Sequence, residues 1–387
     1  MELVSDEHFE SKFSVSFSYG VFFTKNVFDS ENKVLKKVIE PKDKPNKVIV
    51  FVDEGVAKAW PNIEDKIVQY ARSHQDLIKL VGQPIRVVGG ETSKNSWEIV
   101  NKVLEMIERN GICKHAYVIA VGGGAVLDAV GLASTLAHRG VRLIRIPSTT
   151  LSQADSGMGV KNGINGFSKK NFIGTFAPPW AVINDEQLLE TLSDRDWNSG
   201  FAEAIKVALL KDKDYFTQIE LVAEGIARRD LSVSIPVIRR AAKLHAEHIS
   251  GGGDPFEMRS SRPLDFGHWS AHKLEEMSEF SLKHGEAVAI GVALDTVLST
   301  LEYGLPKSDT DRILSCITAV GLPCYSKFLE DTEALKVGLE QFREHLGGDL
   351  VVSMLEGIGK PIDVNKINFK SVIQAVEQLK LVDSKQN

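Results

Sequence analysis

Cysteine is scarce in this sequence, and the few cysteines present are not spaced to share a metal ion. Three residues, Cys113, Cys316 and Cys324, are spread over 387 positions without a CxxC pair. This number and spacing exclude a thiolate zinc cluster and are typical of a chain in a reducing compartment.

Long apolar runs and an excess of positive charge are missing as well. No apolar stretch approaches the roughly 20 residues that cross a bilayer, and the first residues, MELVSDEHFESKF, lack the apolar core of a secretory signal. A net charge of −6 argues against a nucleic-acid or anionic-membrane surface. We expect a cytoplasmic protein with neither partner, long enough for two domains.

The pattern of apolar residues divides the chain into two parts. The first part alternates strand and helix patterns, which is typical of an α/β fold with a largely parallel sheet. Its predicted strands are residues 14–19, 47–52, 85–88, 117–121 and 143–146, and its predicted helices are residues 64–80 and 96–110. Helical periodicity dominates the second part. Its predicted helices are residues 197–210, 235–248, 268–279 and 286–301, with a glycine loop at 251–253.

We place the domain boundary just after the Pro178-Pro179 break, near residues 183–185. This gives an α/β domain over residues 1–184 and an all-α domain over residues 185–387. Because open α/β sheets bind ligands at the carboxyl ends of their strands, we expect the active site in a cleft between the two domains.

Three consecutive glycines stand between a predicted strand and a predicted helix. The segment 118–131 has the sequence VIAVGGGAVLDAVG, with Gly122, Gly123 and Gly124 at the junction. Glycines let backbone N–H groups approach a ligand, and the helix N-terminus adds positive potential. The segment matches neither GxGxxG nor the P-loop, which favours the diphosphate of a dinucleotide over a triphosphate. The alternative is a plain strand–helix turn.

A carboxylate and several imidazoles in the second part form a candidate metal site. Glu203 lies one helical turn before Lys206, His268 and His272 share a helix face, and His284 precedes an apolar helix. One glutamate and two histidines from separate helices make a three-ligand set that leaves positions open on Zn²⁺. Each histidine taken alone is more often a structural residue.

Basic residues mark a candidate phosphate site. The glycine- and asparagine-rich segment 156–175 contains Lys161, Lys169 and Lys170. Ammonium groups and backbone N–H donors in such a loop can hold a phosphate monoester, and a solvated loop with surface lysines is the equal alternative. Arg139 is likewise either a phosphate ligand or a cation at a helix C-terminus.

Taken in order, these segments resemble the sugar phosphate cyclase family, whose best-known member is 3-dehydroquinate synthase. The resemblance extends over nearly the whole chain and rests on the motifs VDE, GGETSK, GGGAVLDAVG, HRG, PSTTLSQADSGMGVKNGIN, KKNFIGTF, FAEAIK, FGHWSAHKLE and LKHGEAVAIG. It implies a Rossmann-like N-terminal domain that binds NAD, a helical C-terminal domain that holds one Zn²⁺ or Co²⁺, a sugar phosphate substrate and a homodimer.

The resemblance also implies roles for individual residues. The implied metal ligands are Glu203, His268 and His284. The implied NAD contacts are Asp53, Glu91, Lys94, Gly123, Gly124, Asp128, Ser148, Thr149, Thr191 and Leu192. The implied catalytic and substrate residues are Asp155, Lys161, Lys206, His272, Lys170 and Asn171, together with Arg139, which reaches the phosphate site of the neighbouring subunit.

Four positions depart from 3-dehydroquinate synthases, which hold a substrate carboxylate with a lysine and an arginine. His245 stands at the lysine position, Ser261 at the arginine position, Asp265 in place of an asparagine, and Trp269 in place of a small hydroxyl residue. Serine and histidine cannot reproduce a bidentate arginine clamp, and Asp265 would repel an anion. The pocket therefore favours a neutral, hydroxyl-rich end of the sugar phosphate.

These departures resemble the cyclases that make C7 cyclitols from sedoheptulose 7-phosphate, of the 2-epi-5-epi-valiolone or 2-epi-valiolone synthase type. The segment FREHLGG at 342–348 favours the same group. Arg262, next to Ser261, is the residue that can restore the carboxylate clamp, together with Arg259. A restored clamp would make the chain a 3-dehydroquinate synthase, which is the first alternative.

The implied reaction is a lyase-type cyclisation in which NAD is used and restored. NAD⁺ takes a hydride from a ring carbinol, phosphate is eliminated, NADH returns the hydride, and the opened ring closes by an intramolecular aldol addition. A metal-dependent NAD polyol dehydrogenase is the second alternative, and it needs no phosphate-binding lysines. A non-catalytic NAD-binding protein would not need the three metal ligands.

Overall fold

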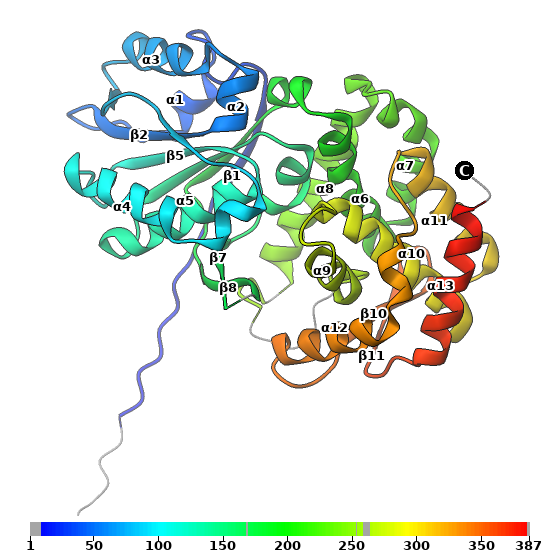
Figure 1. Ribbon diagram of the computed structural model, residues 1–387. Coiled ribbons are helices and arrows are strands. Elements are labelled where there is room, and N and C mark those ends of the chain that lie inside the picture. The colour runs from blue at the N-terminus through cyan, green and yellow to red at the C-terminus, as the bar shows by residue number, and fades with distance from the viewer. Residues whose placement is uncertain (1–8, 168, 253, 258–263, 385–387) are drawn as a thin grey trace, which may run out of the picture.

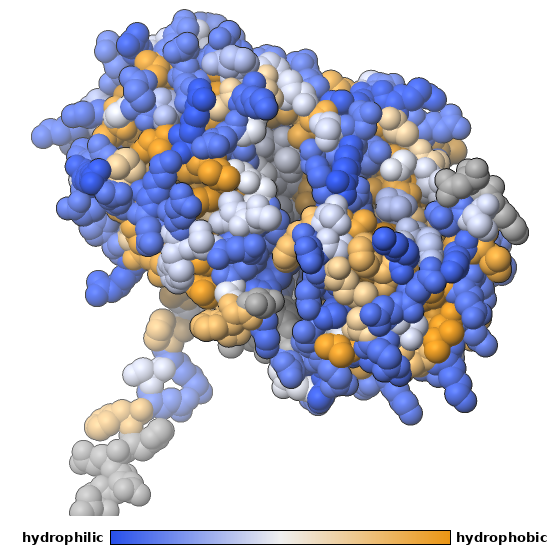
Figure 2. Space-filling view, viewed as in Figure 1, coloured by the Kyte–Doolittle hydropathy of each residue, from blue (hydrophilic) through white to orange (hydrophobic). Residues whose placement is uncertain are grey.

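The computed structural model describes residues 9–384, apart from residues 168, 253 and 258–263. It contains an α/β part and a helical part, which lie side by side (Figure 1). In the described residues, no helix is both long and apolar enough to cross a membrane. Hydrophilic side chains cover most of the face in Figure 2, and apolar residues form small scattered patches.

The α/β part is built around a seven-stranded sheet. Its elements are β1 (Gly20–Thr24), α1 (Val34–Val38), β2 (Asn46–Asp53), α2 (Glu54–Ala59), α3 (Ile63–Ser73), β3 (Ile78–Leu80), β4 (Ile85–Val87), α4 (Glu98–Arg109), β5 (Tyr117–Gly122), α5 (Gly124–Leu136), β6 (Arg142–Pro147), the hairpin β7 (Lys161–Gly166) and β8 (Lys169–Phe176), and β9 (Ala181–Asp185). Short helical turns lie at Glu91–Asn95, Ala137–Arg139, Ser152–Ser156 and Glu186–Thr191.

The strand order changes its direction of winding between β2 and β5. The order is β1-β9-β6-β5-β2-β3, with β4 also beside β2, and the pairings of this sheet are parallel. From β2 the chain first runs to β3 and β4 on one side and then crosses to β5 on the other side. Open α/β sheets bind ligands where the direction of winding changes in this way. A ligand is therefore expected at the carboxyl ends of β2 and β5.

Apolar residues cover both faces of this sheet. Alternate residues of β2 and β5, such as Val50 and Ile119, pack with α1 and α3, while Phe51 and Ala120 pack on the opposite face with α4 and α5. A strand buried on both faces has apolar side chains at successive positions, which is the pattern in 117–122. The predicted α/β fold with a parallel sheet is therefore confirmed.

The helical part has its own, larger core. Its elements are α6 (Asp194–Lys211), α7 (Lys213–Ala227), α8 (Leu231–Gly251), α9 (His268–Met277), α10 (His284–Glu302), α11 (Lys307–Ala319), a short turn at Lys327–Glu330, α12 (Thr332–His345), the hairpin β10 (Val352–Gly357) and β11 (Lys360–Val364), and α13 (Phe369–Asp383). A Cβ atom on Gly285 would lie 2.0 Å from the Ser199 carbonyl oxygen, so α10 begins in direct backbone contact with α6. This contact places His284 beside Glu203.

Three predicted segments are wrong in position or length. Residues 14–19 are extended but form no strand, because the partner strand β9 is matched residue for residue by Gly20–Thr24. The helix predicted at 64–80 ends at Ser73, and residues 78–80 instead pair with β2 as strand β3. The loop predicted at 251–253 begins one residue late, because α8 includes Gly251, and Gly253 lies outside the described residues.

Candidate active site

Polar residues and glycines gather at the carboxyl ends of neighbouring strands. Asp53 ends β2, Gly122 ends β5, and Ser148 follows β6, where its N–H donates to the Gly122 carbonyl at 2.9 Å. The Asp53 carboxylate accepts from the Gly55 N–H at 2.7 Å, and burial raises the pKa of Asp53. These strand ends form the sheet edge at which the sequence predicts a nucleotide.

The three glycines at this edge have different surroundings. A Cβ on Gly122 would lie 2.9 Å from Val126 Cβ, and one on Gly124 would lie 2.8 Å from Ser156 Oγ. In the part of the chain that the structure describes, a Cβ on Gly123 would meet only Thr149 Cγ2 within 4 Å, at 3.4 Å. Gly123 caps α5 without a side-chain hydrogen bond, and the first turn of α5 has no acidic residue. The first turn of α5 thus adds no negative charge of its own, and the Asp53 carboxylate lies within hydrogen-bond reach of the Gly123 N–H.

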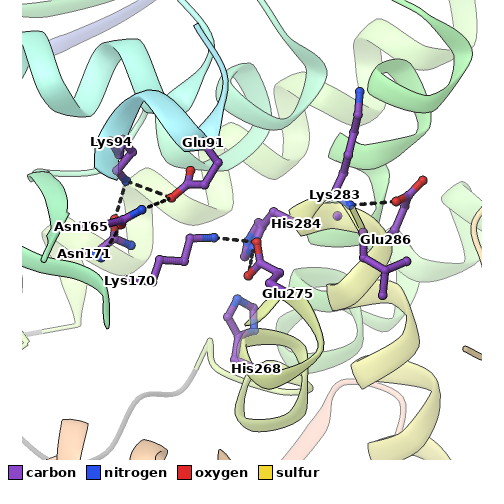
Figure 3. Close-up of polar contacts among 12 residues, drawn as sticks. Glu91, Lys94, Asn165, Lys170, Asn171, His268, Glu275, Lys283, His284 and Glu286 are labelled. Atoms are coloured by element: carbon purple, nitrogen blue, oxygen red, sulfur yellow. Dashed lines mark hydrogen bonds and ion pairs between the residues drawn. The ribbon is translucent and has the colours of Figure 1, made fainter. Parts of the chain in front are cut away.

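Lys94 is the centre of a buried polar network beside α5. Its ammonium group lies 2.9 Å from the Asp128 carboxylate and 3.7 Å from that of Glu91, and it also donates to the Asn171 side chain (Figure 3). Burial opposes the positive charge, but Asp128 and Glu91 raise the pKa of Lys94 above its ordinary value. The network joins three of the predicted nucleotide contacts, Glu91, Lys94 and Asp128, to the β7–β8 hairpin.

Glu203, His268 and His284 converge in the helical part. Their ligand atoms all lie within 4.8 Å of one another. Glu203 Oε1 is 3.5 Å from His268 Nε2 and 3.3 Å from His284 Nε2, and it accepts no hydrogen bond from the described residues. Tetrahedral zinc sites with bonds of about 2.0–2.1 Å hold their ligand atoms roughly 3.3 Å apart. The donor set therefore fits a divalent metal ion.

Each histidine of this cluster has a second polar contact that fixes its ring. His268 Nδ1 is 3.3 Å from the Phe266 carbonyl oxygen, and His284 Nδ1 is 3.1 Å from Glu275 Oε2. An acceptor at Nδ1 keeps the proton on that nitrogen and leaves the Nε2 lone pair free. Both Nε2 atoms face Glu203, which is the arrangement that metal ligation needs.

Lys206 stands next to the cluster on the following turn of α6. Its ammonium nitrogen is 2.5 Å from Glu203 Oε2. Although burial favours the neutral acid, Lys206 holds the pKa of Glu203 well below its usual range. The charges of Glu203, Asp155 and Asp265 in turn raise the pKa of Lys206 against its own burial.

His272 lies one turn after His268, and its ring centroid is 5.4 Å from that of His268. Solvent reaches this ring, yet the surrounding protein and the neighbouring His268 lower the pKa of His272 well below its ordinary value. His272 is therefore neutral at pH 7 and able to accept a proton.

His245 contacts Asp155 rather than standing free in the pocket. His245 Nδ1 is 2.8 Å from Asp155 Oδ1, which joins α8 to the turn at Ser152–Ser156. Although burial opposes ionisation, His245 holds the pKa of Asp155 below its usual value. The residue at the lysine position of the family is thus held by a carboxylate.

The remaining predicted residues lie in several settings. Lys161 is 2.5 Å from Glu257, and Lys170 is 2.7 Å from Glu275. Asp265 is half-buried, and its carbonyl accepts from the His268 N–H at 2.9 Å. Thr149 Oγ1 is 2.8 Å from Ser152 Oγ, whereas Thr191 and Leu192 lie just before α6. Arg259, Ser261 and Arg262 lie outside the described residues.

Arg139 is exposed and takes part in none of the contacts described above. It follows His138, and both residues have a left-handed backbone, with φ of 60° and 53°. In the part of the chain that the structure describes, no ion pair involving Arg139 is found. The prediction that it serves a neighbouring subunit stays a prediction.

Glu275, Asn165 and Arg145 belong to the site region but were not predicted. Glu275 contacts a metal-site histidine and Lys170, and Asn165 accepts from the Asn171 N–H at 2.8 Å. The fully buried Arg145 donates to the carbonyls of Gly159 and Lys161, at 2.7 and 2.8 Å. Glu275 was detectable, because a glutamate seven residues after His268 lies on the same face of its helix.

Asp295 supports the backbone just before His268. It is fully buried and accepts from Trp269 Nε1 and from the Gly267 N–H, both at 2.8 Å. Burial raises the pKa of Asp295 to about 7. Because the folded state then binds a proton that the unfolded state has released, this group lowers the free energy of unfolding as pH rises from about 4 to about 7.

We expect Asp295→Asn to remove this component of the pH dependence. The difference in unfolding free energy between the wild type and the variant should change by up to about 4 kcal/mol across that window. Urea titrations at pH 4.5, 5.5, 6.5 and 7.5 measure it. A constant difference at all four values would show that Asp295 does not titrate there.

Comparison with known proteins identifies the family. The N-terminal model of 3-dehydroquinate synthase matches residues 84–199, and the C-terminal model matches residues 200–350. The chain belongs to the 3-dehydroquinate synthase family. It is thus a sugar phosphate cyclase of that family, as its sequence predicts. The domain boundary predicted at 184/185 stays a prediction.

Relatives with two different activities have similar sequence identity to this cyclase. The 3-dehydroquinate synthase of Rhodopseudomonas palustris (strain TIE-1) is 32% identical and covers 82% of this chain and 83% of its own. A 2-epi-5-epi-valiolone synthase from Actinomyces sp is 29% identical, and the match covers 94% of this chain and 95% of the relative. A solved structure is also similar to this chain: ValA, a 2-epi-5-epi-valiolone synthase from Streptomyces hygroscopicus subsp. jinggangensis 5008 with NAD⁺ and Zn²⁺ bound. Its sequence is 26% identical to this one, and the TM-score is 0.87. The match covers 97% of this chain and 100% of that chain.

Proposed function

We propose that this cyclase converts sedoheptulose 7-phosphate to a C7 cyclitol, 2-epi-5-epi-valiolone or an epimer, and releases phosphate. The observation that supports this most is the pair formed by His245 and Asp155, at 2.8 Å, where 3-dehydroquinate synthases need a free lysine for a carboxylate. The half-buried Asp265 adds negative charge to the same region. A neutral polyol end of a sugar is compatible with these groups, and a carboxylate is not.

NAD and one divalent ion are the proposed cofactors. Gly122–Gly124 and the start of α5 would hold the NAD diphosphate, and Glu203, His268 and His284 would hold Zn²⁺ or Co²⁺. When bound, NAD supplies reversible hydride transfer, and the metal ion polarises a substrate oxygen. The metal-site geometry, the ValA likeness and the open surroundings of Gly123 support this assignment.

Residues of the chain itself would bind the phosphate, transfer protons and orient the substrate. Lys161, Lys170 and Asn171 would hold the phosphate, which departs with the electron pair of its C–O bond. The neutral His272 is able to take a proton, and Lys206 and Asp155 are able to orient hydroxyl groups. The departing phosphate is itself a candidate base.

Gly123→Val is expected to weaken NAD binding by more than about tenfold while the protein stays folded. Among the described residues, the added Cβ meets only Thr149 Cγ2 within 4 Å, at 3.4 Å, but it occupies the space through which backbone N–H groups approach a diphosphate. Isothermal titration with NAD⁺ and a thermal melt measure the two effects. Wild-type affinity in a folded variant would place the diphosphate elsewhere.

A homodimer is also proposed, because Arg139 matches a family residue that reaches the phosphate site of the neighbouring subunit. Its exposure on a left-handed turn is compatible with that role. Light scattering measures the mass in solution. Mixing an Arg139→Ala variant with a Lys170→Gln variant tests the shared site. If one subunit's Arg139 serves the other's phosphate site, both defects fall on one site of the mixed dimer and the other site is intact, so the activity of the mixture rises above the average of the parents. If Arg139 serves its own subunit, the defects lie on different sites and the activity equals that average.

A panel of C6 and C7 sugar phosphates tests the substrate. The protein is incubated with NAD⁺, Zn²⁺ or Co²⁺ and each compound, and released inorganic phosphate is measured. We expect release from sedoheptulose 7-phosphate. The second candidate, 3-dehydroquinate synthase, is favoured by the 32% identity to such an enzyme. Release only from the acidic seven-carbon precursor of dehydroquinate would establish that activity instead.

A further inference from the structure

Glu275 is a buried carboxylate that connects the two parts of the molecule. It lies on α9 with 2% of its surface exposed. One oxygen, Oε2, is 3.1 Å from His284 Nδ1, and the other, Oε1, accepts from the Lys170 ammonium group at 2.7 Å (Figure 3). Lys170 belongs to strand β8 of the α/β part, so this contact crosses between the parts.

The first contact determines which nitrogen of His284 is free. A carboxylate facing Nδ1 keeps a proton there, so Nε2, which lies 3.3 Å from Glu203 Oε1, is the nitrogen available to a metal ion. Carboxylate partners of this kind also orient the ring and increase its basicity toward a metal. Removing the negative charge of Glu275 therefore weakens His284 as a ligand.

The second contact holds Lys170 in a defined position. The next residue, Asn171, accepts from Lys94, so both residues of this part of β8 are fixed by buried charges. An ionised carboxylate can accept from Lys170 and His284 at once. A glutamine has one accepting oxygen, and its NH₂ group would face a second donor.

We propose that Glu275 is a positioning residue that orients His284 for the metal ion and Lys170 for the phosphate of the substrate. One carboxylate thereby sets the geometry of two sites that lie on different parts of the chain. This inference rests on the proposed metal and phosphate sites and adds a residue that contacts neither ligand directly.

The first test is the metal affinity of Glu275→Gln. Zn²⁺ dissociation constants are measured by competition with a chromophoric chelator, and Co²⁺ absorption spectra report the ligand geometry. We expect about 10- to 100-fold weaker Zn²⁺ binding and an altered Co²⁺ spectrum. Glu276→Gln is the matched control, because Glu276 is the next residue of α9, is half exposed and pairs with Lys273. The control should bind both ions as the wild type does.

The second test uses Lys170→Gln, which leaves Glu275 and His284 in place. It should keep the wild-type Zn²⁺ affinity and Co²⁺ spectrum but bind inorganic phosphate about tenfold more weakly by equilibrium dialysis, because a charge-assisted contact is lost. Glu275→Gln should weaken phosphate binding as well. Unchanged phosphate binding in both variants would overturn the phosphate half of the inference.

These outcomes separate the inference from the function on which it rests. A wild-type protein that binds no metal would overturn the proposed metal site. A wild type and a Glu275→Gln variant with equal Zn²⁺ affinity would leave the metal site standing and overturn the role of Glu275. If Glu275→Gln does not fold, Glu275→Asp takes its place. Its shorter side chain keeps the charge but cannot span both partners, so we expect weaker Zn²⁺ binding there too.

Discussion

Replacing His284 by alanine is expected to weaken metal binding by more than about 100-fold and to abolish turnover. This loss exceeds the one expected when only a hydrogen-bond partner of a metal ligand is removed. His284 Nε2 is one of three donor atoms within 4.8 Å of one another, and two remaining donors cannot hold a zinc site of the usual catalytic type. Metal content after dialysis, measured by mass spectrometry, and phosphate release measure the two effects.

His115→Ala is the control for the loss of a histidine, because His115 is exposed and lies at the opposite end of strand β5 from Gly122. It should keep both metal and turnover. A His284→Ala protein that retains one metal ion per chain and full turnover would contradict the ligand set.

Substrate choice is the second large effect that we expect. The wild type should prefer sedoheptulose 7-phosphate over the acidic seven-carbon precursor of dehydroquinate by roughly 30- to several-thousand-fold. This range corresponds to the loss of about 2–5 kcal/mol for a charge-assisted pair. Initial rates of phosphate release from the two substrates at equal concentration measure the preference. Faster turnover of the acidic substrate would identify a 3-dehydroquinate synthase in which Arg262 or Arg259 serves the carboxylate.

Much of the site was predictable because its residues follow local patterns. The glycines at 122–124 mark the end of a buried strand, and the chemistry of strand ends in open sheets indicates the ligand. Glu203, His268 and His284 were predictable as a set because metal sites need few residue types. The structure then places their ligand atoms together.

The remaining features depend on contacts between distant parts of the chain. Nothing local indicates that His245 contacts Asp155 or that Lys170 contacts Glu275 across 105 positions. The strand predicted at 14–19 was wrong for a related reason. Residues Phe13, Val15 and Phe17 alternate with serines as a strand would, but pairing with β9 is available only to residues 20–24. Strand formation requires a partner, and the local pattern does not specify one.

The central claim is that the enzyme uses NAD without consuming it while it releases phosphate. Wild-type protein is given sedoheptulose 7-phosphate, Zn²⁺ or Co²⁺ and NAD⁺ at a concentration far below that of the substrate, and phosphate and NADH absorbance are followed together. We predict many phosphates released per NAD⁺ with no net NADH. Accumulation of NADH in proportion to product, or NADH formation from a polyol without phosphate release, would contradict the cyclase and establish a dehydrogenase.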